Sequence, residues 1–179
     1  MRICIDPGHS GAIEPGAVGQ LGTTEANITL AVAQKCRQLL SDHEVILTRE
    51  SDVGDDLLSW RGRMAAGCDL FVSLHCNAAD PQEAHGSEVW IIDNPSDASQ
   101  ALAVQMCAGL AAVTGEDRGI KRRGFTVISV AESLGVPAVL AEMEFISNPD
   151  GELSLINRQM DYAQAIAGAI VRFGVEAGL

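Results

Sequence analysis

The chain has 179 residues, of which 47% are hydrophobic and 20% charged, and we expect residues 1–179 to form one globular domain. Its net charge of −12 argues against non-specific binding of nucleic acid, which depends on neutralising phosphates with Lys and Arg. Since no apolar run reaches the roughly 18 residues of a membrane-spanning helix, we expect no membrane insertion.

Short apolar runs alternate with segments of helical spacing along the chain. Runs rich in Val, Ile, Leu and Phe predict strands at residues 2–5, 44–48, 69–75, 87–92, 125–129 and 137–142. Apolar residues spaced by three and four predict helices at residues 23–40, 55–67, 96–115 and 160–179. This alternation predicts an α/β fold, with a mostly parallel sheet that helices cover on both faces.

The first predicted strand ends in the turn "DPGHSG", which presents His9. A turn needs Pro and Gly, but it does not need an imidazole. His75 ends the run at 69–75, and Glu142 ends the run at 137–142. Parallel α/β sheets bind ligands beyond the carboxyl ends of their strands, so we expect these three side chains to gather at one edge. His43 and His85 lie in polar segments, and we interpret them as surface residues.

Two histidines and one carboxylate form a familiar ligand set for catalytic zinc, which takes three protein ligands and leaves one position open for water. His9 and His75 favour such a site. Spacing alone leaves the carboxylate open among four residues: Asp6, Glu14, Glu25 and Glu142.

The basic segment that begins at Arg118 and the five cysteines do not require a catalytic role. The segment "RGIKRR", which begins at Arg118, predicts a solvated basic loop, and its alternative role is to clamp carboxylates of a substrate. The five cysteines are odd in number and contain no CxxC pair, so we interpret them as buried thiols of a chain made in a reducing compartment. A catalytic thiol at Cys76 is disfavoured, because neighbouring strand residues point to opposite faces and His75 is its neighbour.

Motifs along the whole chain resemble one known family. They are, in order, "IDPGHSG", "TEANITLAVA", "TRESD", "FVSLHCNA", "GSEVW" and "PAVLAEMEFISNP". From Arg2 to about Phe173 the chain thus resembles the zinc-dependent N-acetylmuramoyl-L-alanine amidases of the amidase-3 type, which occur in cell-wall hydrolases and phage endolysins. The resemblance implies a twisted, mostly parallel six-stranded sheet, one Zn²⁺ per chain and peptidoglycan as the partner.

Matching the motifs residue by residue implies a role for each candidate. His9, Glu25 and His75 become the zinc ligands, and Glu142 becomes the catalytic carboxylate. Asn77 becomes a contact to the substrate or to the ligands. Independently of the match, we expect such contacts from Glu144 and Arg118.

Glu144 departs from the family pattern, which has a small residue two positions after the catalytic glutamate. In a regular strand, Glu142 and Glu144 would face the same side, where Glu144 would tune Glu142 or touch substrate. The alternative is a bulge that turns Glu144 towards solvent.

The resemblance implies hydrolysis of the amide bond between the muramic lactyl group and L-alanine. Two alternatives remain open at this point, namely another zinc amidohydrolase acting on muropeptides and a non-catalytic wall-binding module. No signal peptide is visible, so we expect synthesis in the cytoplasm and action on the cell wall, or a place within a larger exported protein. Some family members carry an inserted helix after the second histidine motif that blocks the zinc. Here a short polar loop, residues 78–86, predicts an open site.

Overall fold

The computed structural model describes residues 1–11, 13–52 and 57–179. Within these residues, six strands form one sheet in the order β2-β1-β3-β6-β4-β5. The strands are β1 (Arg2–Pro7), β2 (Glu44–Leu47), β3 (Leu70–Asn77), β4 (Ser87–Ile91), β5 (Asp117–Arg122) and β6 (Ala138–Phe145). The helices are α1 (Glu25–Leu39), α2 (Leu58–Arg63), α3 (Asp97–Thr114), α4 (Thr126–Ser133), α5 (Pro149–Asn157) and α6 (Gln159–Ala177).

The sheet is mostly parallel, as predicted. Strands β2, β1, β3 and β6 run in one direction, whereas β4 pairs antiparallel with β6 and β5 pairs parallel with β4. The carboxyl ends of β1, β3 and β6 therefore lie at one edge, and the reversed β4 begins near that same edge. In the register of β3 and β6, His75 lies directly opposite Glu142.

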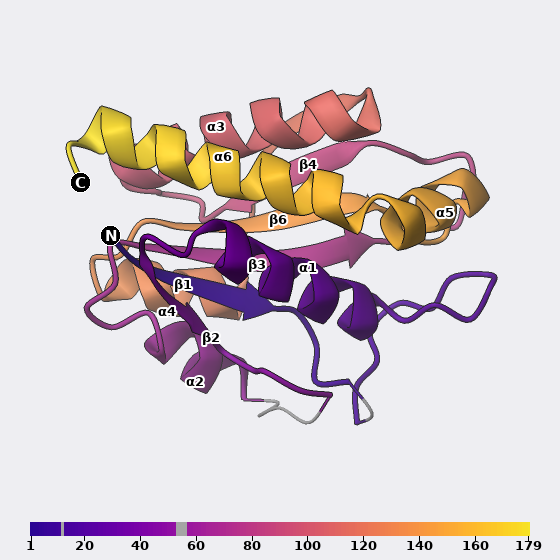
Figure 1. The fold of residues 1–179 in the computed structure, drawn as a ribbon, viewed down its shortest axis with the longest axis horizontal. Helices are drawn as coiled ribbons and strands as arrows, with labels where there is room; N and C mark the ends of the chain where they lie inside the picture. Colours follow the sequence, from indigo (N-terminus) through magenta and orange to yellow (C-terminus); the bar gives the residue numbers. More distant parts are fainter. Residues whose placement is uncertain (12, 53–56) are drawn as a thin grey trace.

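Helices cover both faces of the sheet, which confirms the predicted layers (Figure 1). On one face, α1, α3 and α6 pack against apolar side chains of the strands in the larger core. On the other face, α2 and α4 lie over a smaller core that includes Phe71 and Ile128. The predicted C-terminal helix is α6, and Tyr162, Ile166 and Ile170 on its inner face are fully buried.

Two predictions on the segment 117–133 are wrong. Residues 125–129 were predicted as a strand because they are rich in β-branched and aromatic side chains, but they enter α4. There Val127, Ile128 and Ala131 recur at helical spacing and are buried against the sheet, so packing overrides the local strand preference. The basic segment is not a loop, because Asp117–Arg122 forms β5 at the edge of the sheet. Charged side chains suit such an edge, since they discourage pairing with another chain.

The helix predicted at 55–67 is shorter in the structure. Residues 55 and 56 lie outside the described residues, and α2 ends at Arg63. All five cysteines are buried and unpaired, as predicted from their number and spacing.

Candidate metal centre

The turn after β1 places the imidazole of His9 at the edge of the sheet. His9 has a φ of +64°, which is uncommon for a residue other than glycine. Gly8 lets this turn approach β3, because a Cβ at Gly8 would lie 2.6 Å from Cε1 of His75. A Cβ at Gly16 would likewise lie 2.6 Å from both Glu25 Oε2 and His9 Cδ2. The backbone around the two histidines is therefore shaped to leave room for their rings.

Glu25 opens α1 and reaches both histidines. Thr24 caps the helix by accepting a hydrogen bond from Asn27, and Glu25 is only 4% exposed. Its Oε2 lies 2.9 Å from His9 Nε2, and its Oε1 lies 2.9 Å from His75 Nδ1. Burial alone would raise the pKa of Glu25, but the hydrogen bonds with His75 and His9 outweigh it and hold the pKa far below its usual range.

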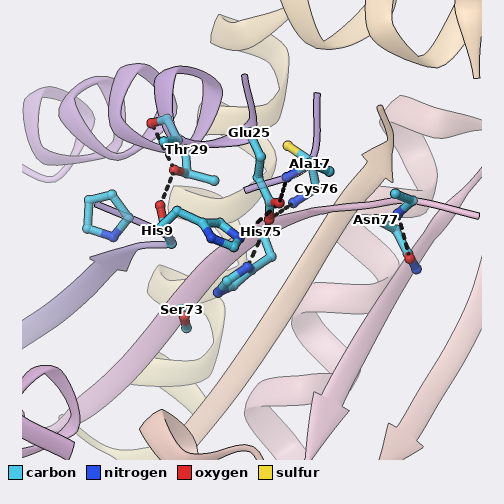
Figure 2. A network of polar contacts seen from close by, with 12 residues as sticks. His9, Ala17, Glu25, Thr29, Ser73, His75, Cys76 and Asn77 are labelled. Carbon is cyan, nitrogen blue, oxygen red and sulfur yellow. Dashed lines mark hydrogen bonds and ion pairs between the residues drawn. The ribbon is translucent and has the colours of Figure 1, made fainter. Parts of the chain in front are cut away.

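Backbone groups fix the Glu25 carboxylate further. The N–H of Cys76 donates to Oε1 at 2.9 Å, and the N–H of Ala17 donates to Oε2 at 3.0 Å. Figure 2 shows both amides beside Glu25, with the imidazoles of His9 and His75 converging on it from the other side. The carboxylate is thus pre-positioned between the two rings.

His9, Glu25 and His75 form one compact donor set. One ligand atom from each lies within 4.8 Å of the other two, and the two imidazole centroids are 5.0 Å apart. Two imidazole nitrogens and one carboxylate oxygen match the donors that catalytic zinc takes. Of the four candidate carboxylates, Glu25 is the one that the structure groups with both histidines.

The remaining carboxylate candidates have other partners. Asp6 is fully buried and accepts hydrogen bonds from Thr48, from Ser73 at 2.6 Å and from Arg61 at 2.7 Å. Glu14 faces the far side of His9, with its Oε2 2.6 Å from Nδ1. Asp6 therefore fixes the end of β1, just before the turn, to its neighbours. Glu14 fixes the orientation of the His9 ring from the side away from Glu25.

A cavity of about 440 Å³ opens beside this donor set. His9, His75 and Glu142 line it together with apolar side chains that include Phe125 and Leu140. Oε2 of Glu142 is buried and has no hydrogen-bond partner among the described residues. Burial, joined by the charges of Glu25 and Glu88, raises the pKa of Glu142 to about 7, although His75 acts in the opposite direction. A carboxyl with such a pKa can both accept and donate a proton near neutral pH.

Glu88 is a residue of this site that the sequence did not reveal. It lies opposite Glu142 where β4 pairs antiparallel with β6, and it is 5% exposed. Asn77 Nδ2 donates to its Oε1 at 2.9 Å, and Arg118 Nε donates to its Oε2 at 3.1 Å. The structure thus places two predicted contact residues, Asn77 and Arg118, on Glu88. The motif "GSEVW" predicted the strand β4 but not its antiparallel direction. That direction brings Glu88 to the site.

Glu144 lies in neither of the two places considered for it. The pairing of β3 and β6 shifts register between His75 and Asn77, so the strand is not regular next to Glu144. Its side chain is 4% exposed, and its Oε1 accepts hydrogen bonds from Gly86 N at 2.7 Å and Phe145 N at 2.8 Å. It lines a different cavity, of about 360 Å³, and so faces neither solvent nor the donor set.

Glu144→Gln should therefore reduce stability without reducing turnover. Both N–H groups donate to Oε1, which glutamine keeps only as a neutral carbonyl oxygen, and hydrogen bonds to a charged acceptor are about twice as strong. We therefore expect a loss of about 1 kcal/mol. Urea unfolding and release of a soluble product from labelled peptidoglycan measure the two effects. A stable variant with turnover lowered more than about tenfold would contradict this placement.

His85, His43 and Cys76 take no part in the donor set. His85 Nε2 lies 3.1 Å from Glu116 Oε2, and His43 Nδ1 lies 3.5 Å from the amino group of Met1. Cys76 belongs to the larger core, on the opposite side of β3 from His75, and burial raises the pKa of its thiol well above the ordinary value. This geometry confirms that the thiol points away from the site.

Comparison with known proteins gives a consistent result. The family described as N-acetylmuramoyl-L-alanine amidase, Amidase_3, matches residues 3–172. N-acetylmuramoyl-L-alanine amidase LytC of Bacillus subtilis is 35% identical over 94% of this chain and 34% of its own length. The probable cell wall amidase LytH of Staphylococcus epidermidis is 34% identical over 94% of this chain and 55% of its own length. The chain thus spans about half, or less, of these two relatives.

Solved structures show the same fold over nearly the whole chain. The catalytic domain of CwlV, an N-acetylmuramoyl-L-alanine amidase from Bacillus (Paenibacillus) polymyxa, superposes with a TM-score of 0.86 at 34% identity, covering 97% of this chain and 98% of that one. An N-acetylmuramoyl-L-alanine amidase from Clostridium difficile 630 gives a TM-score of 0.89 at 28% identity, covering 98% and 97%. We conclude that the chain belongs to the amidase-3 family of N-acetylmuramoyl-L-alanine amidases.

Proposed function

We propose that this chain hydrolyses the amide bond between N-acetylmuramic acid and L-alanine in peptidoglycan, with residues 1–179 as the catalytic domain. The observation that carries this proposal is the unpartnered Oε2 of Glu142, which is buried beside the donor set of His9, Glu25 and His75. A buried polar atom without a partner needs water or a ligand. Membership of an amidase family indicates which reaction this arrangement serves.

In this proposal His9, Glu25 and His75 hold one Zn²⁺. When bound, zinc supplies a Lewis acid that lowers the pKa of water and polarises a carbonyl oxygen. The residues fit such an ion, because the three donors already converge and glycines at positions 8 and 16 leave space around them. The hydrogen bonds from the backbone N–H groups of Ala17 and Cys76 orient the Glu25 carboxylate between the two imidazoles.

Glu142 is the group that moves the proton. Its carboxylate takes a proton from the attacking water and then gives it to the nitrogen of the leaving alanine. The amide needs this second transfer, because an unprotonated amine anion is a poor leaving group. Burial and the neighbouring charge of Glu88 raise the pKa of Glu142 to about 7, which suits both halves of this exchange.

The cavity suits the groups on either side of the scissile bond. Its lining includes four apolar residues, namely Leu58, Phe125, Val127 and Leu140. The lactyl group and L-alanine each carry a methyl group next to the amide, and apolar contact with these residues would orient both. The polar lining residues His9 and Glu142 would then face the carbonyl and the nitrogen.

Mass spectrometry of digested peptidoglycan tests the function directly. We expect intact stem peptides with a new N-terminal alanine, together with glycan strands that have lost their peptides. Cleavage within the stem peptide, or loss of acetyl groups, would assign the chain to another zinc amidohydrolase. Binding to walls without any product would assign it to a non-catalytic module.

The place of action in this proposal is the cell wall. None of the described helices combines the length and the apolar composition of a membrane-spanning segment.

We expect the purified chain to digest peptidoglycan without an added activator. The loop between β3 and β4 is short, and its described residues 78–86 form no helix that would lie over the cavity. None of these loop residues lines the cavity next to His9 and Glu142. Turbidity of purified cell walls, followed with the chain alone and with the 78–86 loop clipped, measures this. Digestion that began only after clipping would contradict an open site.

A further inference from the structure

One buried arginine contacts the chain next to two of the proposed ligands. Arg49 follows β2 in the motif "TRESD" and is 6% exposed. Its Nη2 donates to the carbonyl of Gly8 at 3.1 Å and to the carbonyl of Ala26 at 2.6 Å. Gly8 immediately precedes His9, and Ala26 immediately follows Glu25. A single guanidinium therefore joins the two segments that carry these ligands.

Other hydrogen bonds add to this junction between the His9 turn and the start of α1. Arg49 Nε donates to the carbonyl of Pro7 at 3.1 Å, and Nη2 lies 3.2 Å from Thr29 Oγ1. Thr29 in turn donates to the carbonyl of Gly8 at 2.9 Å. Figure 2 shows Thr29 on α1 facing the turn that carries His9. The His9 turn is thus connected to the N-terminal part of α1 by hydrogen bonds of the Arg49 and Thr29 side chains.

The conformation of His9 makes this connection necessary. A non-glycine residue at a φ of +64° stays there only when its surroundings fix it. The carbonyls of Pro7 and Gly8, just before it, are both held by Arg49. Without the hydrogen bonds from Arg49, the Gly8 carbonyl would keep its bond from Thr29 and the Pro7 carbonyl its bond from Arg61. The direct tie between the turn and the Ala26 carbonyl would be lost, so that the His9 ring could shift relative to Glu25.

Arginine is the residue type that fits this position. Its planar guanidinium presents five N–H donors in a fixed fork, so that it reaches several carbonyls at once. A lysine carries one compact ammonium on a flexible stem and cannot hold carbonyls on both sides in the same geometry.

We propose that Arg49 is a positioning residue for the metal centre, which fixes the His9 turn and the start of α1 relative to each other. This rests on the proposed function in one respect, the role of His9 and Glu25 as ligands. Arg49 touches neither the cavity nor the donor atoms. Its effect passes through Gly8 and Ala26 to the separation of the two ligand side chains.

The test compares Arg49→Met and Arg49→Lys with two controls. Methionine keeps the apolar stem of arginine and removes every donor. Arg61→Met removes a second buried arginine, which bonds Asp6 and the carbonyl of Pro7 and, among the described residues, donates no hydrogen bond to α1. Leu102→Ala removes a fully buried side chain of α3, far from the donor set, and controls for a general loss of stability.

The first measurement is amide hydrogen exchange of the metal-free proteins. We expect Arg49→Met to speed exchange in residues 8–11 and 25–29 together, and Leu102→Ala to speed it across the sheet. Arg61→Met leaves the buried Asp6 without its cationic partner, so it should speed exchange in residues 8–11 and in the strands around Asp6 more than in residues 25–29. Because no metal is present, this outcome does not depend on the proposed function. Unchanged exchange at residues 25–29 in Arg49→Met would overturn the proposal.

The second measurement is the dissociation constant for Zn²⁺, obtained by competition with a chelator. Loss of a group that orients ligands weakens metal binding by roughly 10- to 100-fold, which we expect for Arg49→Met, with a smaller loss for Arg49→Lys. Leu102→Ala should stay within about twofold of wild type. If Arg49→Met does not fold, Arg49→Lys decides, since a stable Lys variant with wild-type affinity and exchange would overturn the proposal. A wild-type chain that binds no Zn²⁺ would instead remove the proposed function, while the exchange result would still report on the junction.

Discussion

Glu142→Gln is expected to keep its zinc and to lose turnover by roughly two to four orders of magnitude, the usual loss when a general base is removed. Glutamine has nearly the size of glutamate, so the packing of β6 should not change. Its amide cannot accept the proton of the attacking water, and it cannot return one to the leaving nitrogen. Initial rates on labelled peptidoglycan and the zinc content of the same preparation measure both effects.

Glu144→Gln is the matched control, because it makes the same chemical change two residues along the same strand. It should turn over at close to the wild-type rate, since Glu144 bonds Gly86 and Phe145 away from the cavity. Near-normal turnover in Glu142→Gln, together with loss in Glu144→Gln, would show that the other glutamate acts.

His75→Ala is expected to purify with little zinc. Changes in groups that only orient a ligand already cost roughly 10- to 100-fold in metal affinity, so loss of a ligand should cost at least about 100-fold. The cavity that the ring leaves would remain polar on the side of Glu25, so that the protein should stay folded. Elemental analysis after gel filtration gives the zinc content per chain.

His85→Ala is the control for this change. His85 is exposed and pairs with Glu116 outside the donor set, so its removal should leave the zinc content unchanged. Full zinc occupancy in His75→Ala would remove His75 from the ligand set.

The gathering of His9, His75 and Glu142 was predictable because it depends on a general rule. Each follows or ends a short apolar run, and parallel strands bring their carboxyl ends to one edge. Glu25 was different. Spacing left Glu25 as one of four candidate carboxylates, and only the family resemblance selected it. The sequence pattern does not show that the loop between the His9 turn and α1 brings the start of α1 back next to His9.

What the sequence did not predict depends on contacts far apart along the chain. Glu88 reaches the site because β4 runs antiparallel to β6, and the direction of a five-residue strand cannot be predicted from its sequence. The segment 125–129 has strand-forming side chains but is helical, because Val127 and Ile128 are buried against the sheet. The motif "TRESD" contains Arg49 but predicts no role for it, and only the structure shows its burial and its contacts with Gly8 and Ala26.

The order of strands also has a consequence for how the chain folds during synthesis. The centre of the sheet is the pairing of β3 with β6, and all of β4, α3, β5 and α4 lies between these two strands in sequence. The N-terminal half leaves the ribosome first, so the edge of β3 that later pairs with β6 stays unpaired until β6 has been synthesised. That edge belongs to a strand with Phe71, Val72 and Leu74, which would otherwise pair with other chains. Non-local pairing of this kind slows folding. When β6 pairs with β3, it completes the centre of the sheet and places Glu142 at the edge where the two histidines already lie.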